Sequence, residues 1–185
     1  MKNNDLVPHL FRTEYRKIVS VLCRHFGFDG IEDAEDIASD TFLTAAETWG
    51  LTGVPSNPVA WLYHVAKNKA WNYTSRNTFF ENKIVPELKV TSGMIEPPDI
   101  DLSAQNIIDS QLQMMFAVCH PAISPEAQVG LALRILCGFG IEEIADAFLT
   151  GTETINKRLF RAKKQLRSKR VRIEFPGVAE IENRV

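Results

Sequence analysis

The segment from Ile141 to Arg172 has the pattern of two short helices joined by a tight turn, and it constrains the fold more than any other part of the chain. Its first half repeats apolar residues at the spacing of one helix face, at Ile141, Ile144, Ala145 and Phe148. Its second half does the same at Ile155, Leu159, Ala162 and Leu166. Gly151 is expected to interrupt the helix, and Thr150 or Thr152 to cap the one that follows. The sequence therefore predicts a helix-turn-helix with a packed inner face.

The outer side of the second helix in this segment is basic. At 100° per residue it collects Glu153, Thr154, Lys157, Arg161 and Lys164, with Asn156 and Arg158 on its flanks. Nine Lys or Arg and no acid lie from Lys157 to Arg172, although the whole chain has a formal net charge of −2. A solvated helix end whose cations complement the helix dipole is one interpretation. A recognition helix in the DNA major groove is the other, and the apolar helix and short turn before it favour this second one.

Length and composition are those of an ordinary soluble protein. The chain has 185 residues, which suits one average domain or two small ones. No run of 18 apolar residues is present, and the N-terminal sequence lacks the apolar core of a signal peptide. We therefore expect a cytoplasmic protein with no membrane partner.

The three cysteines, Cys23, Cys119 and Cys137, are widely spaced and form no C-x-x-C pair. This pattern fits reduced thiols better than a disulfide framework. Cys23 with His25 and Cys119 with His120 raise a metal hypothesis, but neither pair has a usual zinc-ligand spacing. We interpret them as core cysteines and predict no metal and no cofactor.

The first half of the chain is predicted to form three helices. The first is marked by Leu10, Phe11, Tyr15, Ile18, Leu22 and Phe26, and it is closed by Gly27 and a turn over 28–30. The second, over 31–49, has an inner face of Ala34, Ile37, Ala38, Phe42, Ala45 and Trp49. Its outer face consists of Asp36, Ser39, Asp40, Leu43 and Glu47, and the span from Asp29 to Glu47 holds seven acids and no base. An acidic face is usually only solvated. Because Leu43 lies in the middle of this one, a face that binds a basic partner is an equally good interpretation.

A loop is predicted over 50–57, where Asn57 caps and Pro58 starts a third helix. Leu62, Val65, Ala66 and Tyr73 can pack inward, and Trp61 is also expected in the core. Its other faces carry Tyr63, His64, Lys67, Asn68, Lys69, Trp71, Asn72 and Arg76. Aromatic rings that alternate with cationic and amide groups suit nucleic acid, because rings stack on unpaired bases while cations hold phosphates.

The second half is predicted to be helical after a linker rich in proline and acid. A helix over 103–119 is expected to point Ile108, Leu112, Met115 and Phe116 inward. The next helix opens at Ser124-Pro125 and ends at Gly138, and its apolar body is expected at the centre of the second domain. The predicted fold is all-α, with small helical domains at 1–82 and 104–173, a flexible linker at 83–103 and a tail at 174–185.

Three ordered motifs resemble one known family. DAEDIASDTFLTAAETW and NPVAWLYHVAKNKAWNYTSRN are similar to the conserved region 2, and IEEIADAF with TINKRLFRAKKQLR is similar to region 4, of extracytoplasmic-function sigma factors of bacterial RNA polymerase. The resemblance runs from about Phe11 to Arg170. The stretch CHPAISPEAQVGLALRILCGF resembles the subgroup with a long helical C-terminal extension, which is absent from this sequence.

The resemblance implies a role for each surface. It assigns docking on core RNA polymerase to Asp36, Ser39, Asp40, Leu43 and Glu47. It assigns opening of the −10 promoter element to the loop over 50–57 and to Tyr63, His64, Lys67, Asn68, Trp71 and Arg76. It assigns the −35 element to Glu153, Thr154, Asn156, Lys157, Arg158, Arg161 and Lys164. An anti-sigma protein or the missing extension would be a regulatory partner.

Two other classes of function fit the sequence less well. A stand-alone helix-turn-helix regulator would dimerise on a palindromic site with half-sites about one helical turn apart. An enzyme is disfavoured, because the four histidines have no partnered Ser or Cys motif and there is no phosphate-binding glycine loop. We therefore predict a promoter-specificity subunit without catalytic residues, whose partners are core polymerase and promoter DNA.

Overall fold

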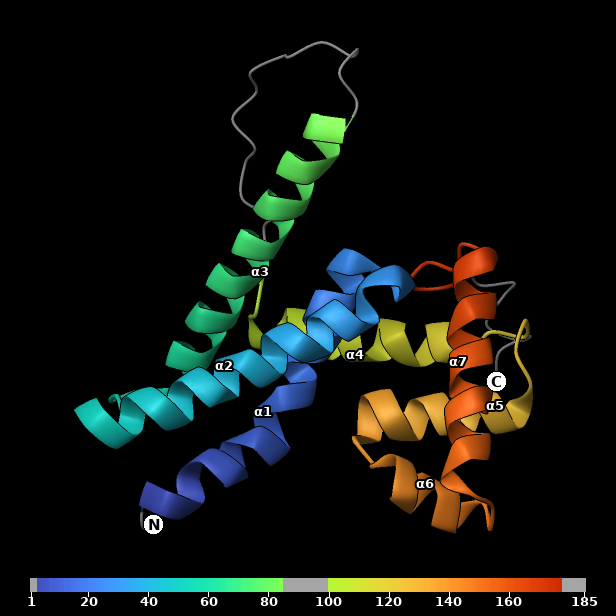
Figure 1. Cartoon of the computed structure of the whole chain (residues 1–185), viewed down its shortest axis with the longest axis horizontal. Helices are drawn as coiled ribbons and strands as arrows, with labels where there is room; N and C mark the ends of the chain where they lie inside the picture. Colours follow the sequence, from blue (N-terminus) through green and yellow to red (C-terminus); the bar gives the residue numbers. More distant parts are fainter. Residues whose placement is uncertain (1–2, 85–99, 178–185) are drawn as a thin grey trace.

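The computed structural model describes residues 3–84 and 100–177, and helices are its only regular secondary structure in these ranges (Figure 1). The all-α prediction is confirmed. The elements in chain order are α1 (Asn3–Phe26), the single turn η1 (Phe28–Gly30), α2 (Ile31–Thr52), α3 (Pro58–Ile84), α4 (Ala104–Val118), α5 (Pro125–Leu131), η2 (Ala132–Cys137), α6 (Ile141–Ala147) and α7 (Thr152–Ser168).

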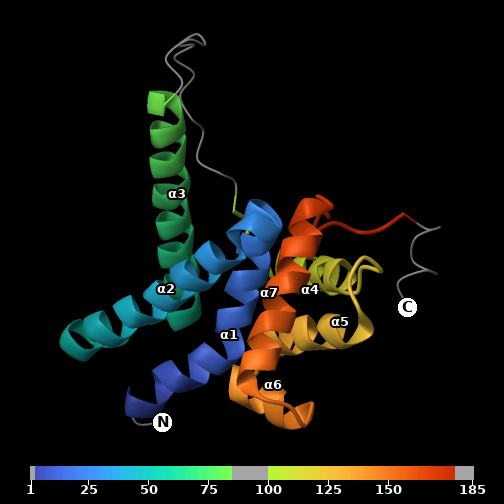
Figure 2. The same cartoon turned by 45° about the vertical axis from the view of Figure 1, so that its right-hand side comes forward.

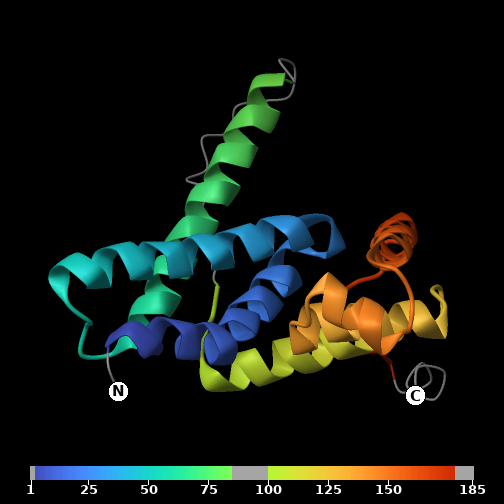
Figure 3. The same ribbon diagram turned by 60° about the horizontal axis from the view of Figure 1, so that its bottom comes forward.

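We call α1 to α3 the first unit and α4 to α7 the second unit. Helix α1 joins the two units. It packs against α2 and α3 of the first unit and also against α4 and η2 of the second. In Figures 1 and 2, α3 and the second unit stand on opposite sides of α1. Figure 3 shows the far end of α3 projecting away from the other helices. The predicted domain boundaries remain predictions, and most of the predicted linker lies outside the described residues.

The inner face predicted for α2 is confirmed. All six apolar positions of α2 from Ala34 to Trp49 are buried. Trp61 is also a core residue, because its ring lies 5.3 Å from that of Trp49. Asn57 caps α3 as expected, since its Oδ1 accepts a hydrogen bond of 3.0 Å from the Ala60 amide.

Two predicted boundaries in the first half were wrong. Helix α2 continues to Thr52, where Gly53 ends it with φ 85°, so Gly50 does not start the loop. Helix α3 continues to Ile84 and therefore includes the first two residues assigned to the linker. On the other side of the undescribed stretch, Ile100 is already buried in the core, so the linker's last residues belong to the packed structure.

The inward face predicted for α4 was wrong by one residue. The buried positions are Ile107, Met114, Ala117 and Val118, whereas Ile108, Leu112 and Met115 are exposed and Phe116 is only partly buried. Apolar residues stand in adjacent pairs at 107–108 and 114–115, so the spacing alone fits two helix faces. Packing on α1 selects the face that includes Ile107 and Met114.

The predicted central helix of the second unit is present but less buried than expected. It comprises α5 and the π-helical turn η2, and Gly138 ends it in the left-handed conformation with φ 70°. Leu131 and Ile135 are buried, but Val129 is half exposed and Cys137 is exposed. A π-helical turn advances by more residues than an α-helical one, so it rotates later side chains away from the α-helical phase.

The helix-turn-helix is formed by α6 and α7, and all four predicted inner residues of α7 are buried. The turn differs from the prediction. Gly151 is extended, with φ −79°, and no side chain caps α7. Leu149 takes the left-handed conformation instead, with φ 51°, while the Thr150 amide donates 2.9 Å to the Ala145 carbonyl. The backbone hydrogen bonds at the end of α6 therefore determine the position of the turn. They place its left-handed residue at Leu149, which the sequence does not predict.

Candidate protein and nucleic-acid interfaces

The outer face of α2 is exposed along its length. We call Asp36, Ser39, Asp40, Leu43 and Glu47 the acidic stripe, and every member is exposed. Leu43 is 57% exposed although its neighbour Phe42 is buried, so its side chain is directed to solvent. Asp40 lies 3.9 Å from Lys69 of α3, so the negative charge of the stripe comes mainly from Asp36 and Glu47. The stripe can therefore receive a basic partner around one apolar anchor.

Phe11 and Tyr15 of α1 border this stripe and were not assigned to it from the sequence. Phe11 is 43% exposed, and its ring lies 5.1 Å from that of Phe42. The Tyr15 hydroxyl lies 3.3 Å from the Ser39 hydroxyl, and burial raises the pKa of Tyr15. Both residues occupy core positions in the periodicity of α1, so only the structure shows that they reach the surface beside α2.

The outer face of α3 presents most of the predicted nucleic-acid residues. His64, Lys67, Asn68, Trp71 and Arg76 are all exposed, and Trp71 is 42% exposed. Tyr63 and Lys67 line an open groove of about 400 Å³ that continues onto residues 100–102. Stacked bases need an accessible ring and nearby cations, and this face offers both.

Tyr63 differs from the other residues of that face, because its hydroxyl is used inside the protein. It donates a 2.6 Å hydrogen bond to Glu14 Oε2, and Lys17 donates 2.9 Å to Oε1 of the same carboxylate. Burial raises the pKa of Glu14, but the two donors outweigh it and the net pKa is lowered. For Tyr63, burial and the Glu14 carboxylate both raise the pKa. Tyr63 therefore ties α3 to α1.

The outer face of α7 carries the predicted −35 residues. Glu153, Thr154, Asn156, Lys157, Arg161 and Lys164 are exposed. Arg158 is partly buried, and its guanidinium lies 5.2 Å from the ring centroid of Phe148. Lys157, Arg158 and Arg161 also line a groove of about 410 Å³ against Ser124 of the turn before α5. The exposed cations can hold phosphates, whereas Arg158 also fixes α7 on the turn.

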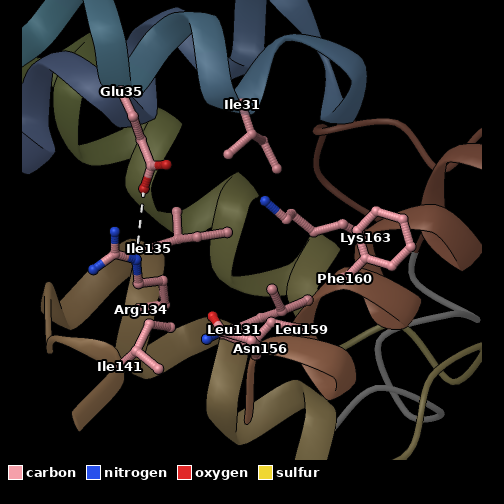
Figure 4. Close-up of a pocket in the computed structure, with 10 residues that line it drawn as sticks. All are labelled: Ile31, Glu35, Leu131, Arg134, Ile135, Ile141, Asn156, Leu159, Phe160 and Lys163. Carbon is pink, nitrogen blue, oxygen red and sulfur yellow. Dashed lines mark ion pairs between the residues drawn. The ribbon is translucent and has the colours of Figure 1, made fainter. Parts of the chain in front are cut away.

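A cavity lies between α7 and the first unit. It has a volume of about 370 Å³, and Figure 4 shows its walls, formed by Ile31 and Glu35 of α2, Leu131, Arg134 and Ile135 of α5 and η2, Ile141 of α6, and Asn156, Leu159, Phe160 and Lys163 of α7. Glu35 and Arg134 face each other across it at 3.9 Å. Burial raises the pKa of Glu35, and Arg134 only partly offsets this effect.

The three cysteines are free thiols. Cys23 is buried as expected, whereas Cys119 is only partly buried and Cys137 is exposed. Burial strongly raises the pKa of Cys23, so it is an unreactive core residue. Within residues 3–84 and 100–177, no three His, Cys, Asp or Glu side chains are grouped in a way that could hold a metal ion. None of the helices described is long and apolar enough to cross a membrane.

Comparison with known proteins identifies the first unit. Residues 10–79 match the family model for sigma-70 region 2, which covers α1, α2 and most of α3. The acidic stripe and the exposed face of α3 both lie within this match. The first unit therefore has the sequence of a sigma-70 region 2.

Relatives extend the similarity into the second unit. The RNA polymerase sigma factor YlaC of Bacillus subtilis is 26% identical over 90% of this chain and 93% of its own length. The ECF RNA polymerase sigma-E factor of Haemophilus influenzae is 24% identical over 83% of this chain and 81% of its own length. An uncharacterized protein of Rhizobium meliloti is 27% identical over 85% of this chain, which spans only 38% of that relative.

An alignment that covers 90% of the chain must include most of α4 to α7 as well as region 2. The order of the motifs, the all-helical fold and the named relatives agree. Residues 10–79 therefore belong to the sigma-70 region 2 family, and most of the chain is similar to RNA polymerase sigma factors that include an extracytoplasmic-function member.

Proposed function

We propose that the chain is an RNA polymerase sigma factor of the extracytoplasmic-function group, which binds core RNA polymerase through the first unit and directs promoter-specific transcription initiation by presenting two DNA-binding faces. The observation that carries the proposal is the separation of charge between two amphipathic helices. Helix α2 exposes acids around Leu43, and α7 exposes cations around Lys157 and Arg161. One chain therefore has a surface for a protein partner and another for phosphates.

Docking on polymerase is assigned to the acidic stripe. A protein interface gains most of its affinity from a few apolar or aromatic anchors, and a charged rim steers association and excludes wrong partners. Leu43 has the anchor position, and Asp36, Asp40 and Glu47 have the rim positions. Phe11 lies beside them and enlarges the apolar part of the same surface.

Promoter opening is assigned to the outer face of α3. Capture of an unpaired base by an aromatic ring contributes about 1 to 3 kcal/mol, which can stabilise a melted −10 element without another energy source. Trp71 supplies the exposed ring, and Lys67 and Arg76 supply cations on the same helix. Tyr63 has a structural role instead, because its hydroxyl donates a hydrogen bond to Glu14 of α1.

Recognition of the −35 element is assigned to α7. The N-terminal residues of a recognition helix contact base edges, and later cations hold the backbone. Asn156 and Lys157 have the base-contact positions, and Arg161 and Lys164 have the phosphate positions. The chain has a net charge of −2, so on its own it should bind DNA weakly, and polymerase supplies the remaining affinity.

The proposed role is non-catalytic and belongs in the cytoplasm, where polymerase and chromosome are found. An anti-sigma protein that covers the acidic stripe or α7 would be a natural regulator, because either surface is needed for initiation. The test is run-off transcription from genomic fragments with purified core polymerase. Start sites that require both the chain and core polymerase are expected. Binding to a palindrome by a dimer without polymerase would contradict the proposal.

A further inference from the structure

The cavity between α2 and α7 has an aliphatic floor. Ile31, Leu131, Ile135 and Leu159 line it, and each is at most 5% exposed, so these side chains form the buried part of its wall. Phe160, which is 64% exposed, lines its solvent side. Small-molecule sites have volumes from about 300 to 1,000 Å³ and mostly apolar walls. With a volume of about 370 Å³, this cavity has the size and the lining for one small organic molecule (Figure 4).

Three charged side chains from three different elements line the same cavity. Glu35 comes from α2, Arg134 from η2 and Lys163 from α7. Figure 4 shows the Glu35 carboxylate directed toward Arg134, and the Lys163 ammonium group directed toward the middle of the cavity. One anionic and two cationic groups therefore meet beside the aliphatic floor. Such a combination of apolar walls and a few convergent polar groups is typical of a ligand site.

The Glu35 carboxylate is incompletely compensated by the protein. It lies 3.9 Å from Arg134, which is longer than a hydrogen bond, and no group in the described parts of the chain donates a hydrogen bond to it. Burial raises the pKa of Glu35, and Arg134 and Lys163 only partly offset this effect. Its side chain is still 24% exposed, so a ligand can reach it. An ammonium group placed beside it would replace the hydration that the carboxylate has lost.

The two cations have hydrogen-bond donors to spare. Arg134 donates 3.3 Å from Nη1 to the Phe139 carbonyl oxygen, which uses one of its five N–H groups. Lys163 donates to Glu32, and an ammonium group has two further donors. A carboxylate of a ligand can therefore accept hydrogen bonds from both cations while their contacts within the protein remain. Hydrogen bonds between ionised partners are the stronger kind, so they can orient a small ligand.

We propose that this cavity binds a small zwitterion with an apolar side group, of the chemical class of the apolar α-amino acids. The ligand's ammonium group faces Glu35, its carboxylate faces Arg134 and Lys163, and its side group covers the aliphatic floor. A purely cationic ligand leaves the two cations without an anion, and a purely anionic one leaves Glu35 without a donor. An α-amino acid carries both charges at one carbon and is small enough for this volume. The inference does not depend on the proposed function, because it concerns the inner surface between the units.

The first test compares three probes by isothermal titration calorimetry on the full chain. L-phenylalanine carries both charges, 2-phenylethylamine lacks the carboxylate, and 3-phenylpropionate lacks the ammonium group. For a ligand of this size, the Kd of L-phenylalanine should lie between about 10 μM and 1 mM. Each analogue should bind at least about tenfold more weakly, because one charged contact is lost. The proposal is overturned if either analogue binds as tightly as L-phenylalanine, or if neither L-phenylalanine nor L-leucine binds at about 10 mM.

The second test assigns the charges of the ligand to their partners. Glu35→Gln keeps the shape of the side chain and removes its charge, so it should weaken binding of L-phenylalanine about tenfold without weakening that of 3-phenylpropionate. Arg134→Gln should weaken L-phenylalanine but not 2-phenylethylamine. Asp33→Asn is the matched control, since Asp33 is on the same turn of α2 as Glu35 but does not line the cavity. Equal effects of Glu35→Gln and Asp33→Asn overturn the proposal.

The third test locates the ligand without any substitution, so it can be read even if a variant fails to fold. Ile31, Ile135 and Ile141 line the cavity, whereas Ile18 and Ile107 are buried elsewhere on α1 and α4. In the chain labelled at its isoleucine methyl groups, L-phenylalanine should shift the methyl resonances of the first three residues and leave those of the other two in place. Shifts at Ile18 and Ile107 alone, or at no isoleucine, overturn the proposal.

Discussion

Helices α2 and α7 bury the same kind of face and expose opposite ones. Both place an apolar face against their neighbours, and their inner positions are buried from Ala34 to Trp49 and from Ile155 to Leu166. Outside, α2 is acidic around a leucine and α7 is basic. Folding requires only that the inner faces pack, so the outer faces are available to specify partners. The difference shows that partner choice in this molecule is a property of surface charge arranged on similar scaffolds.

The largest expected effect comes from breaking the docking side of this comparison. Leu43→Arg places a cation in the middle of the acidic stripe and removes its only apolar member. Loss of an interface anchor costs about 2 kcal/mol or more, so affinity for core polymerase should fall about 30-fold or more in a pull-down or titration. Circular dichroism should show an intact fold, because Leu43 is exposed.

Ile108→Arg is the matched control, since Ile108 of α4 is 58% exposed against 57% for Leu43. It should leave polymerase affinity within about twofold if docking is confined to the first unit. Equal losses for the two variants would mean that the second unit also docks, and the division between the helices would then be incorrect.

The next effect separates base capture from duplex binding. Trp71→Ala should weaken the open promoter complex by about 1 to 3 kcal/mol, because a stacking ring is lost, and should affect the closed complex much less. Permanganate reactivity of unpaired thymines reports opening, and a mobility shift at low temperature reports the closed complex. Ile108→Ala, at a 58% exposed position of α4, is the control for surface truncation. A parallel loss in both steps would contradict the role given to Trp71.

A smaller effect concerns the hydrogen bond between Tyr63 and Glu14. Tyr63→Phe should cost about 1 to 2 kcal/mol of unfolding free energy at neutral pH, since a donor to a carboxylate is lost. The pKa of Glu14 is lowered below its ordinary value of 4.5, so its contribution is present above that pH and is lost as pH falls through the folded value. Chemical denaturation should therefore show a smaller gap between wild type and variant in acid. A gap that widens on acidification would contradict this assignment.

The smallest effect concerns a single phosphate contact of α7. Arg161→Ala should weaken binding to duplex DNA by similar amounts for all sequences, and it should reduce the slope of log affinity against log salt by about 1. Arg12→Ala on α1 is the control, because Arg12 is exposed on the first unit, away from α7. An unchanged slope for Arg161→Ala would remove this residue from the DNA interface.

Sequence patterns predicted the helices better than the details that join them. The inner faces of α2 and α7 were correct because most of their apolar residues fall on one helical face, although Phe42-Leu43 and Leu159-Phe160 are adjacent pairs. In α4 the pairs Ile107-Ile108 and Met114-Met115 permit two phases, and only contact with α1 decides between them. The turn before α7 was misplaced because Leu149 has no intrinsic preference for the left-handed conformation that the helix end requires.

Contacts between distant parts of the chain were beyond the sequence argument. The pairing of Glu32 with Lys163 depends on how the two units are arranged, and each residue alone fits an ordinary solvated face. The same is true of Phe11 and Tyr15, whose spacing on α1 is that of core residues. Composition and periodicity predict the candidate surfaces, but the residues at the edges of these surfaces can be identified only from the structure.

The packing of α4 on α1 limits how far the molecule can rearrange. Met114, Ala117 and Val118 are fully buried on α4, so detaching this helix would expose a hydrophobic seam at a cost of several kcal/mol. Helix α7 is held in the same way on its own side by the buried Ile155, Leu159, Ala162 and Leu166, so it cannot leave the second unit alone at a lower cost.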